Sequence, residues 1–477
     1  MKMTSVLVGS FYFFLLSLPL SKSTFAYSFD EYMVEVRSKN SALLGSEKVI
    51  KGTSLRTNEA KLNYLPNFFM NGLYSDDKRL TNAPAFLVSQ TLRETYQAGL
   101  SQQFKSGTKT TVSYNFAQTT INGASPLFLP NSNFYDVAPQ LELTQSLWRN
   151  WWGGETRASE ELIQSGVDSL NFMEKFRYKQ LMMNAEMNYW RLAFAQEIVL
   201  VQKDSLERSK KLKDWNYSRF STGLADESDY LQSSSAMTAR ELEYQTAVIE
   251  EKSASRLFNS LREIEDDSVD QKLTPPEDND LLNLKIPERN GNREDVQASL
   301  SQKKIAQAQA QLGEEKNKPT LEVYGSYSLN GRAASNGPAV DMALTTDHPY
   351  TIVGLRFNTP INVINLSNNK EGYSQEKIAA DYNYQRKLFE QEKEWKDLVN
   401  KFHDYQERLK LAQKMENAQK EKLSKEKARF NRGRTTTFQI LQFEQDFANA
   451  QLLKLRYESE LINTYAQLKL FVGVAHE

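Results

Sequence analysis

Apolar and polar side chains alternate with a period of two in four short stretches of an otherwise helical chain. Residues 321–329 and 353–357 alternate in the second half, each next to a proline. Residues 68–74 and 141–147 occupy the corresponding positions in the first half. Each stretch predicts a strand with one apolar and one polar face, so the sequence predicts four amphipathic strands in each chain.

The first half holds more sequence between its two strands than the second half does. Within that excess, residues 95–122 alternate on either side of a Lys-Ser-Gly turn, which predicts an inserted hairpin. The pattern allows three positions for this hairpin: outside the cell, within the same sheet, or as a cap over it.

Long helical patterns follow the strands in both halves. From Ser146 to Gly223 and from Pro360 to Gly433 each leg extends on the order of 100 Å if it is mostly helical. Apolar residues within 183–201 and 441–466 recur at spacings of three and four, which is typical of coiled coils. We therefore expect the legs to pack side by side.

The tips of the two predicted helical hairpins repeat one skeleton, an Arg-Phe pair followed three positions later by glycine. It occurs at Arg219 to Gly223 and again at Arg429 to Gly433. Such a repeat indicates an internal duplication. The predicted divisions are a signal peptide (1–26), a first structural repeat (27–264), a linker (265–290), a second structural repeat (291–472) and a C-terminal tail (473–477).

Composition excludes several classes of protein. A mean hydropathy of -0.61 argues against a helical membrane protein. A net charge of -1 gives no reason to expect a nucleic-acid partner. Cysteine is absent, and the histidines at 348, 403 and 476 lack the spacing of metal ligands. No catalytic motif is present, so we expect neither an enzyme nor a bound cofactor or metal.

The first 26 residues combine one lysine, an apolar core and small residues before Ala26, which predicts an export signal. A short membrane anchor is the alternative, although the apolar core is shorter than the roughly 20 residues that a spanning helix needs.

Strands of this length with alternating faces suit an outer-membrane barrel. Trp148, Trp151 and Trp152 follow the last strand of the first half, where they would suit an interfacial aromatic belt; ordinary packing is the alternative. Four strands are too few to close a barrel, and an open edge does not face lipid. Three copies would supply twelve strands, and the charged helical legs would continue as a tunnel in water.

Several segments in this order resemble the TolC family of outer-membrane efflux proteins. They are LELTQSLW (141–148), PTLEVYGSY (319–327), VGLRFNTP (353–360), RFNRGRTTTFQIL (429–441), AQ (450–451) and LFVG (470–473). The resemblance covers nearly the whole chain after the export signal. It implies a homotrimeric duct in the bacterial outer membrane with a periplasmic extension, contacting membrane lipid and serving a tripartite efflux pump or a type I secretion system. Its partners would be a periplasmic adaptor and an inner-membrane pump of the RND, ABC or MFS type.

The resemblance also implies where the adaptor docks, which is at the two hairpin tips. The matching positions are Arg219, Phe220, Gly223 and Leu224 in the first tip, and Arg429, Phe430, Gly433 and Arg434 in the second. Glycine at a helix end adopts positive φ at little cost and permits close approach of a partner backbone. The alternative is that both glycines only turn the chain.

A constriction lined by acidic side chains is common in the family just beyond the second tip. Here Gln439 and Gln442 occupy those positions, so this chain departs from the pattern. Asp226, Glu227 and Asp229 beyond the first tip are alternative gate residues, and Asp229 is a candidate partner for Arg434. These carboxylates also suit the start of a helix, where the helix dipole favours them.

An exported fibrous coiled-coil adhesin or structural envelope protein is the alternative to an exit duct. It would explain the long helices but not the amphipathic strands beside the tryptophans.

Overall fold

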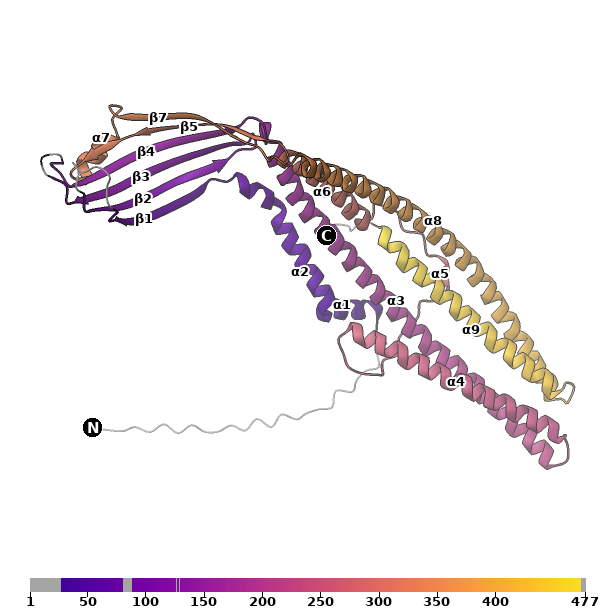
Figure 1. The fold of residues 1–477 in the computed structure, drawn as a ribbon. Coiled ribbons are helices and arrows are strands. Elements are labelled where there is room, and N and C mark those ends of the chain that lie inside the picture. The colour runs from indigo at the N-terminus through magenta and orange to yellow at the C-terminus, as the bar shows by residue number, and fades with distance from the viewer. Residues whose placement is uncertain (1–26, 80–87, 126, 128, 473–477) are drawn as a thin grey trace, which may run out of the picture. The chain divides into compact units, whose positions relative to one another are not determined.

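The computed structural model describes residues 27–79, 88–125, 127 and 129–472, and it is mostly helical with one antiparallel sheet (Figure 1). The predicted signal peptide (1–26) and C-terminal tail (473–477) lie outside the described residues. The strands are β1 (Asn67–Asp77), β2 (Gln90–Gln103), β3 (Thr108–Asn122), β4 (Asn133–Ser146), β5 (Thr320–Leu329), β6 (Gly331–Ala333) and β7 (Pro349–Asn358). The helices are α1 (Phe29–Lys39), α2 (Ser41–Leu55), α3 (Gly154–Ser221), α4 (Glu227–Leu261), α5 (Asp278–Leu282), α6 (Glu294–Lys316), α7 (Asn336–Ala343), α8 (Val363–Phe430) and α9 (Thr437–Leu468), with 3-10 turns at Arg56–Tyr64, Trp151–Gly153 and Lys469–Phe471.

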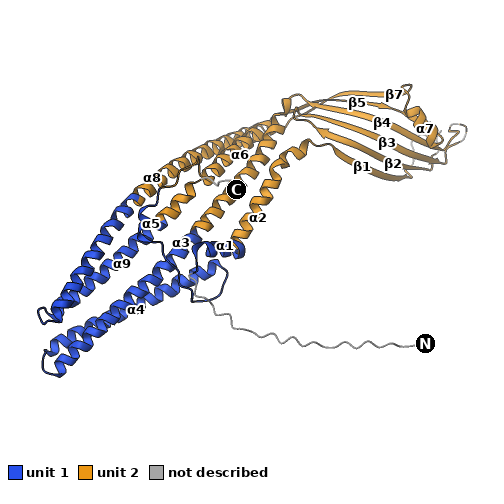
Figure 2. Cartoon of the chain, turned by 180° about the vertical axis from the view of Figure 1, so that it is seen from behind, with its two compact units in different colours: residues 1–40, 184–285, 403–463 blue, residues 41–183, 286–402, 464–477 orange. Residues whose placement is uncertain are grey.

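The chain divides into two compact units, coloured separately in Figure 2. Residues 1–40, 184–285 and 403–463 form the first unit, and residues 41–183, 286–402 and 464–477 form the second. Each unit thus combines parts of both predicted repeats. None of the helices in the described ranges is both long and apolar enough to cross a membrane.

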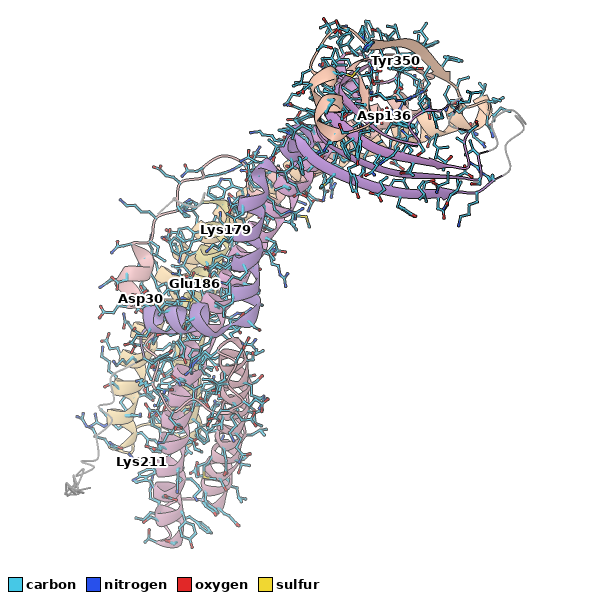
Figure 3. The ribbon with its side chains drawn as sticks, turned by 90° about the vertical axis from the view of Figure 1, so that its left-hand side faces the viewer. Asp30, Asp136, Lys179, Glu186, Lys211 and Tyr350 are labelled. Carbon is cyan, nitrogen blue, oxygen red and sulfur yellow. The ribbon has the colours of Figure 1, made fainter. Side chains whose placement is uncertain are left out.

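The sheet belongs to the second unit and has the order β1-β2-β3-β4-β5-β7, with β6 beside β4. Asp136 on β4 and Tyr350 on β7 both lie in this sheet (Figure 3). The mainly helical fold with amphipathic strands is confirmed. The sheet holds more strands than the expected four. The inserted hairpin, as β2 and β3, pairs between β1 and β4, which is one of the three positions that the sequence left open, and the short β6 pairs with β4.

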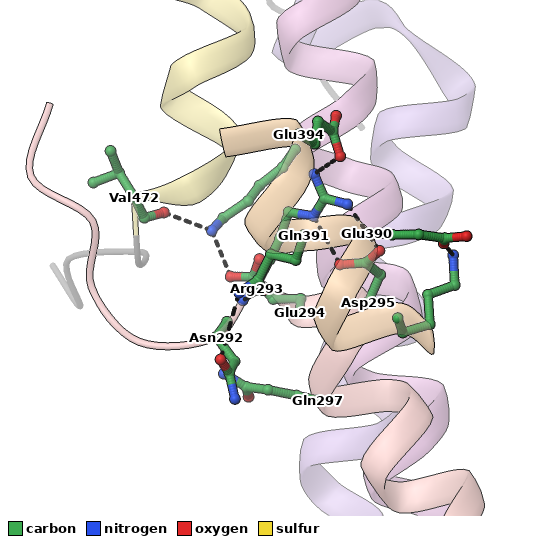
Figure 4. A network of polar contacts seen from close by, with 11 residues as sticks. Asn292, Arg293, Glu294, Asp295, Gln297, Glu390, Gln391, Glu394 and Val472 are labelled. Carbon is green, nitrogen blue, oxygen red and sulfur yellow. Dashed lines mark hydrogen bonds and ion pairs between the residues drawn. The ribbon is translucent and has the colours of Figure 1, made fainter. Parts of the chain in front are cut away.

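Arg293 organises the polar contacts at the start of α6 (Figure 4). Its guanidinium donates to Asp295 at 2.8 Å and to Glu394 on α8 at 2.8 Å, and it lies 4.7 Å from the ring centre of Phe471. Arg293 occupies the N-cap position of α6 without a side-chain capping bond, and its backbone N–H donates to the side chain of Gln391.

An aromatic cluster forms the core of the first unit. Tyr32, Tyr189 and Phe258 are almost fully buried, and the rings of Tyr32 and Phe258 stack with centroids 4.3 Å apart. Ser28 and Glu31 form a capping box at the start of α1. This helix is separated from α2 by a break at Asn40, whose side chain donates to the carbonyl of Leu261 at 2.9 Å.

The predicted linker is packed against the first unit over much of its length. Leu273 and Leu281 are fully buried, and the side chain of Gln196 on α3 accepts from the backbone N–H of Leu273. Gln406 on α8 donates to the carbonyls of Leu282 and Leu284. The segment that joins the two repeats is therefore held by hydrogen bonds as well as by apolar burial.

Candidate functional site

The two hairpin tips, which both lie in the first unit, close with the same hydrogen bonds. In the first tip, Leu224 N–H donates to Arg219 C=O at 2.8 Å, and Gly223 N–H donates to Phe220 C=O at 2.9 Å. In the second tip, Arg434 and Gly433 make the equivalent bonds to Arg429 and Phe430, at 3.0 and 2.9 Å. This pair of bonds is the Schellman motif, which requires a left-handed residue after the helix. The two tips thus share their backbone hydrogen bonds as well as their sequence motif.

Both tip glycines adopt the positive φ that this motif needs, +73° at Gly223 and +69° at Gly433. No atom lies within 4 Å of the place where a Cβ would stand on either glycine, so both backbones border open space. Leu224 beside the first glycine is 70 % exposed. A partner backbone therefore has access to both turns.

Aromatic packing joins the two tips to each other. The ring of Trp215 on α3 lies 4.5 Å from that of Phe430 on α8, measured between centroids. Phe430 is only 6 % exposed and belongs to a core cluster with Leu423, Ile440 and Phe447. Among the residues expected at the docking surface, Phe430 thus lies inside the protein. Its counterpart Phe220 is partly exposed and stacks on Tyr230.

A second contact between the tips is ionic. Glu444 on α9 accepts from Arg208 on α3 at 2.7 Å and pairs with Lys427 on α8 at 2.6 Å. The Glu444 side chain is 14 % exposed and that of Arg208 is 23 % exposed. Deeper still, Thr437 donates to the side chain of Asn216 at 3.4 Å, and both residues are buried. The first hairpin is therefore fastened to the second by charge and hydrogen bonding as well as by the aromatic pair.

These contacts border a groove of about 260 Å³. Its walls carry three basic side chains, an aromatic pair and one carboxylate. They are formed by Arg208, Lys211, Leu212, Trp215, Lys427, Phe430, Asn431, Ile440 and Glu444. The guanidinium of Arg219, next to this wall, lies 4.6 Å from the ring centre of Trp215 and donates to the carbonyl of Leu224.

The expected gate residues lie near the tips but do not join one another. Asp226 occupies the position before α4 without a side-chain capping bond, and Glu227 is exposed. None of the ion pairs within the described ranges joins Asp229 to Arg434. Gln439 accepts from the hydroxyl of Thr435, and Gln442 donates to Asp446. Each of the two glutamines thus bonds within its own hairpin.

The three tryptophans lie at the end of the sheet from which α3 begins. Trp148, Trp151 and Trp152 are 49 %, 51 % and 63 % exposed. The turn that carries them is tight, because Asn150 and Trp152 both have positive φ and Gly153 lies against the carbonyl of Lys105. Each of these rings thus has about half or more of its surface exposed on the single chain.

The sequence reading did not identify Arg208, Trp215 and Glu444. Their signal is weak but present: Arg208, Leu212 and Trp215 follow the spacing of four and three that places residues on one helix face. That face leads directly into the Arg219–Phe220 motif, so extending the motif backward by about three turns would have reached Trp215 and Arg208.

Residues 286–474 match the family described as Outer membrane efflux protein. The matched residues lie in the second half of the chain. The fold of the chain is that of solved outer-membrane channels. It resembles the CmeC outer membrane channel of Campylobacter jejuni (16 % identity, 99 % of this chain and 96 % of that chain, TM-score 0.63) and VceC of Vibrio cholerae (14 %, 93 % and 96 %, 0.64). It also resembles the open state of the MtrE outer membrane channel of Neisseria gonorrhoeae (13 %, 93 % and 89 %, 0.61). No curated protein matches the sequence.

The second half of the chain thus matches the family of outer-membrane efflux proteins, and the whole fold is that of outer-membrane channels, as the resemblance implied. The family is one of transport proteins rather than of enzymes. The fibrous adhesin is not supported, because the fold of outer-membrane channels accounts for both the sheet and the long helices.

Proposed function

We propose that this outer membrane efflux protein is the exit duct of a tripartite efflux pump or a type I secretion system. Three copies form the duct, and substrates enter it from a periplasmic adaptor fed by an inner-membrane pump. The pump selects the cargo, and it is of the RND, ABC or MFS type. The paired tips carry this proposal: two glycine turns with the same hydrogen bonds and similar φ, both open to a partner, stand at the ends of two hairpins that pack on each other.

The adaptor docks on these tips. Gly223 and Gly433 offer exposed backbone, while Arg219, Leu224, Arg429 and Arg434 surround them with side chains that a partner can contact. Phe220 contributes by packing on Tyr230 of its own hairpin, and Phe430 contributes by packing on Trp215 of the other hairpin. The basic groove between the tips favours an adaptor that presents carboxylates.

Docking also opens the tunnel, because it competes with the contacts that fasten the tips together. The pair between Arg208 and Glu444 is the main polar fastening. Asp226, Glu227, Asp229, Gln439 and Gln442, near the two tips, are the candidate gate residues. The glutamines supply hydrogen-bonding groups without charge, so this mouth has no acidic ring at their positions. Cation block at that level would accordingly be weak.

The tryptophan side chains at 148, 151 and 152 mark the inner interface of the outer membrane. Indole rings favour the level of lipid headgroups. These three rings are about half exposed and lie between the end of β4 and the start of α3.

Cysteine crosslinking in cells tests the docking proposal directly, since the natural chain contains no cysteine. Leu224→Cys and Arg434→Cys are each treated with a short maleimide–photoreactive crosslinker. We expect both to capture the same periplasmic adaptor, identified by mass spectrometry, in a band that also depends on the presence of the inner-membrane pump. Glu407→Cys on the exposed face of α8 is the matched control. Equal capture from the control position would contradict docking at the tips.

Conductance in planar bilayers tests the duct itself. A heat-modifiable trimer that conducts ions supports the proposal, whereas a fibre that is released without detergent and does not conduct would refute it.

A further inference from the structure

The inserted hairpin is a full member of the sheet. β2 pairs with β1 from Thr91 to Ser101, and β3 pairs with β4 from Thr108 to Thr120. In the second repeat, β5 pairs directly with β7 and nothing stands between them. Apart from the three-residue β6, which pairs with β4, the first repeat therefore brings two more strands to the sheet than the second repeat does.

Apolar side chains of the hairpin continue the apolar face of its neighbours. Leu100 on β2 stands opposite Phe68 on β1 and Val112 on β3, and Val112 stands opposite Leu141 on β4. One row of apolar side chains thus crosses four strands. The next rows repeat the pattern, with Met70 opposite Ala98 and Ala98 opposite Tyr114.

The other face of the same strands is polar. The side chain of Asn71 on β1 donates to Gln97 on β2, and Asn115 on β3 donates to Gln140 on β4. A shift of one residue in the pairing would exchange the two faces, so the shared register is set by this pattern.

At these rows the described part of the chain leaves the apolar face about half exposed, whereas it covers the polar face more closely. Leu100 and Val112 are 52 % and 53 % exposed, while Ser113 on the polar face is 6 % exposed. A hairpin acting as a plug or a lid would bury its apolar side chains against the protein. The apolar side chains of this hairpin are exposed on the chain, so an apolar medium outside the chain must cover them.

The ends of the hairpin also follow the pattern of membrane strands. Its own turn is short and lies at the helix end of the sheet, where Lys105 pairs with Glu160 on α3 at 2.7 Å. The connections at its other ends are longer, residues 78–89 and 123–132. Outer-membrane barrels have short turns on the periplasmic side and longer loops outside.

We propose that the hairpin β2–β3 is part of the lipid-facing wall and gives each chain six wall strands in place of four. This inference rests on the proposed trimeric duct, in which β1 and β7 form the chain's two unpaired edges and join neighbouring copies. Three copies then close a barrel of about eighteen strands. Because barrel diameter grows roughly in proportion to strand number, this barrel is about one and a half times as wide as a twelve-stranded barrel. The occupant of the apolar face is the hydrocarbon of the outer membrane, and the polar face lines a wide exit.

Single cysteines in the full-length protein, reconstituted in liposomes, test this placement. A charged, membrane-impermeant maleimide is applied to Leu100→Cys and Val112→Cys on the apolar face, and to Gln97→Cys and Asn115→Cys on the polar face. We expect the polar-face cysteines to react at least about ten times faster, because lipid shields the others. Similar rates on both faces would overturn the proposal.

A control pair on β5 separates this inference from the proposed function. Tyr327→Cys and Ser326→Cys lie on the apolar and polar faces of a strand that belongs to the wall in either case. If labelling rates differ between the two faces on β5 but not on the hairpin, the six-strand wall is refuted and the proposed duct is not. Absence of alternation on both would refute the duct as well.

Disulfide formation gives a second measurement that does not depend on labelling. Asn71→Cys with Gln97→Cys, and Ser113→Cys with Gln140→Cys, join residues that are partners across β1/β2 and β3/β4. Both disulfides should form in protein oxidised in native outer membranes. If either pair stays reduced while β5 and β7 crosslink through Ser326→Cys and Ile352→Cys, the hairpin does not stand in the wall.

Discussion

The ring of Trp215 packs against the ring of Phe430 with 4.5 Å between their centroids, and this contact joins two helical hairpins that are far apart in the sequence. Phe430 belongs to the motif that is duplicated in the chain, whereas Trp215 comes just before the first copy of that motif. The duplication thus supplies two similar tips, and residues outside the repeated motif fasten them together.

Phe430→Ala should loosen the tips. The change removes a buried aromatic side chain, which in protein cores costs about 3–5 kcal/mol, and here the loss falls on a cluster at the end of the hairpins. We expect faster trypsin cleavage at the arginines of the second tip and a higher conductance in planar bilayers. Phe438→Ala is the control, because Phe438 is 62 % exposed. Unchanged cleavage in the Phe430 variant would contradict a fastening role.

Glu444→Gln should also loosen the contact between the two tips, by removing an ion pair instead of an aromatic contact. The carboxylate serves both Arg208 and Lys427, and its loss leaves a partly buried guanidinium without its charged partner, at a cost of about 1–3 kcal/mol. Conductance should rise, and it should rise less when salt already screens the pair.

The exchange of Arg208→Glu with Glu444→Arg provides the rescue experiment for this ion pair. It restores opposite charges at the same positions, so conductance should return toward the natural level. Glu421→Gln, which removes an exposed carboxylate paired with Lys425 on α8, should have no effect. A failure of the double exchange to recover any closure would argue that packing alone fastens the tips.

Local patterns in the sequence predicted most of this fold, because the period of two in the strands and the spacing of three and four in the helices are both clear. Alternation over residues 321–329 and the repeated Arg-Phe-x-x-Gly tip depend only on neighbouring residues. The pairing partners of β2 and β3 depend on a sheet assembled from both halves of the chain, so the hairpin's place stayed open. In the same way, the burial of Phe430 depends on Trp215 in another helix. The break at Asn40 also follows from a distant bond, to the carbonyl of Leu261.

Gly223→Ala and Gly433→Ala should destabilise the two tips by similar amounts. Both residues have positive φ in the same hydrogen-bonded turn, where a Cβ costs on the order of 1 kcal/mol although there is space for it. Gly166→Ala within α3 and Gly372→Ala within α8 are matched controls that also meet no atom, and there alanine should stabilise by roughly 0.5–1 kcal/mol. Hydrogen exchange at the tips measures the difference. Equal effects at tip and helix positions would contradict the Schellman geometry.

Glu458 should make the stability of the first unit depend on pH. It lies 4 % exposed on α9 in a cluster where Lys454 pairs with Asp278 at 2.8 Å. Burial, together with a hydrogen bond to Asp278, raises the pKa of Glu458 from 4.5 to about 8, despite the nearby lysine. The folded state therefore holds a proton that the unfolded chain has lost between these values, so stability should fall as the pH rises from about 5 to about 8.

Glu458→Gln keeps the shape of this side chain and removes its titration. Near pH 5 the variant should be as stable as the natural protein. At pH 9 its free energy of unfolding should be higher, by a few kcal/mol at most, because it no longer buries a second negative charge beside Asp278. Glu407→Gln is the control, since that carboxylate is exposed and Lys410 lowers its pKa. Thermal unfolding followed by circular dichroism at pH 5, 7 and 9 measures the effect. If Glu458→Gln is instead the less stable protein at pH 9, the ionised carboxylate is needed to balance Lys454, and the cluster shares its proton differently.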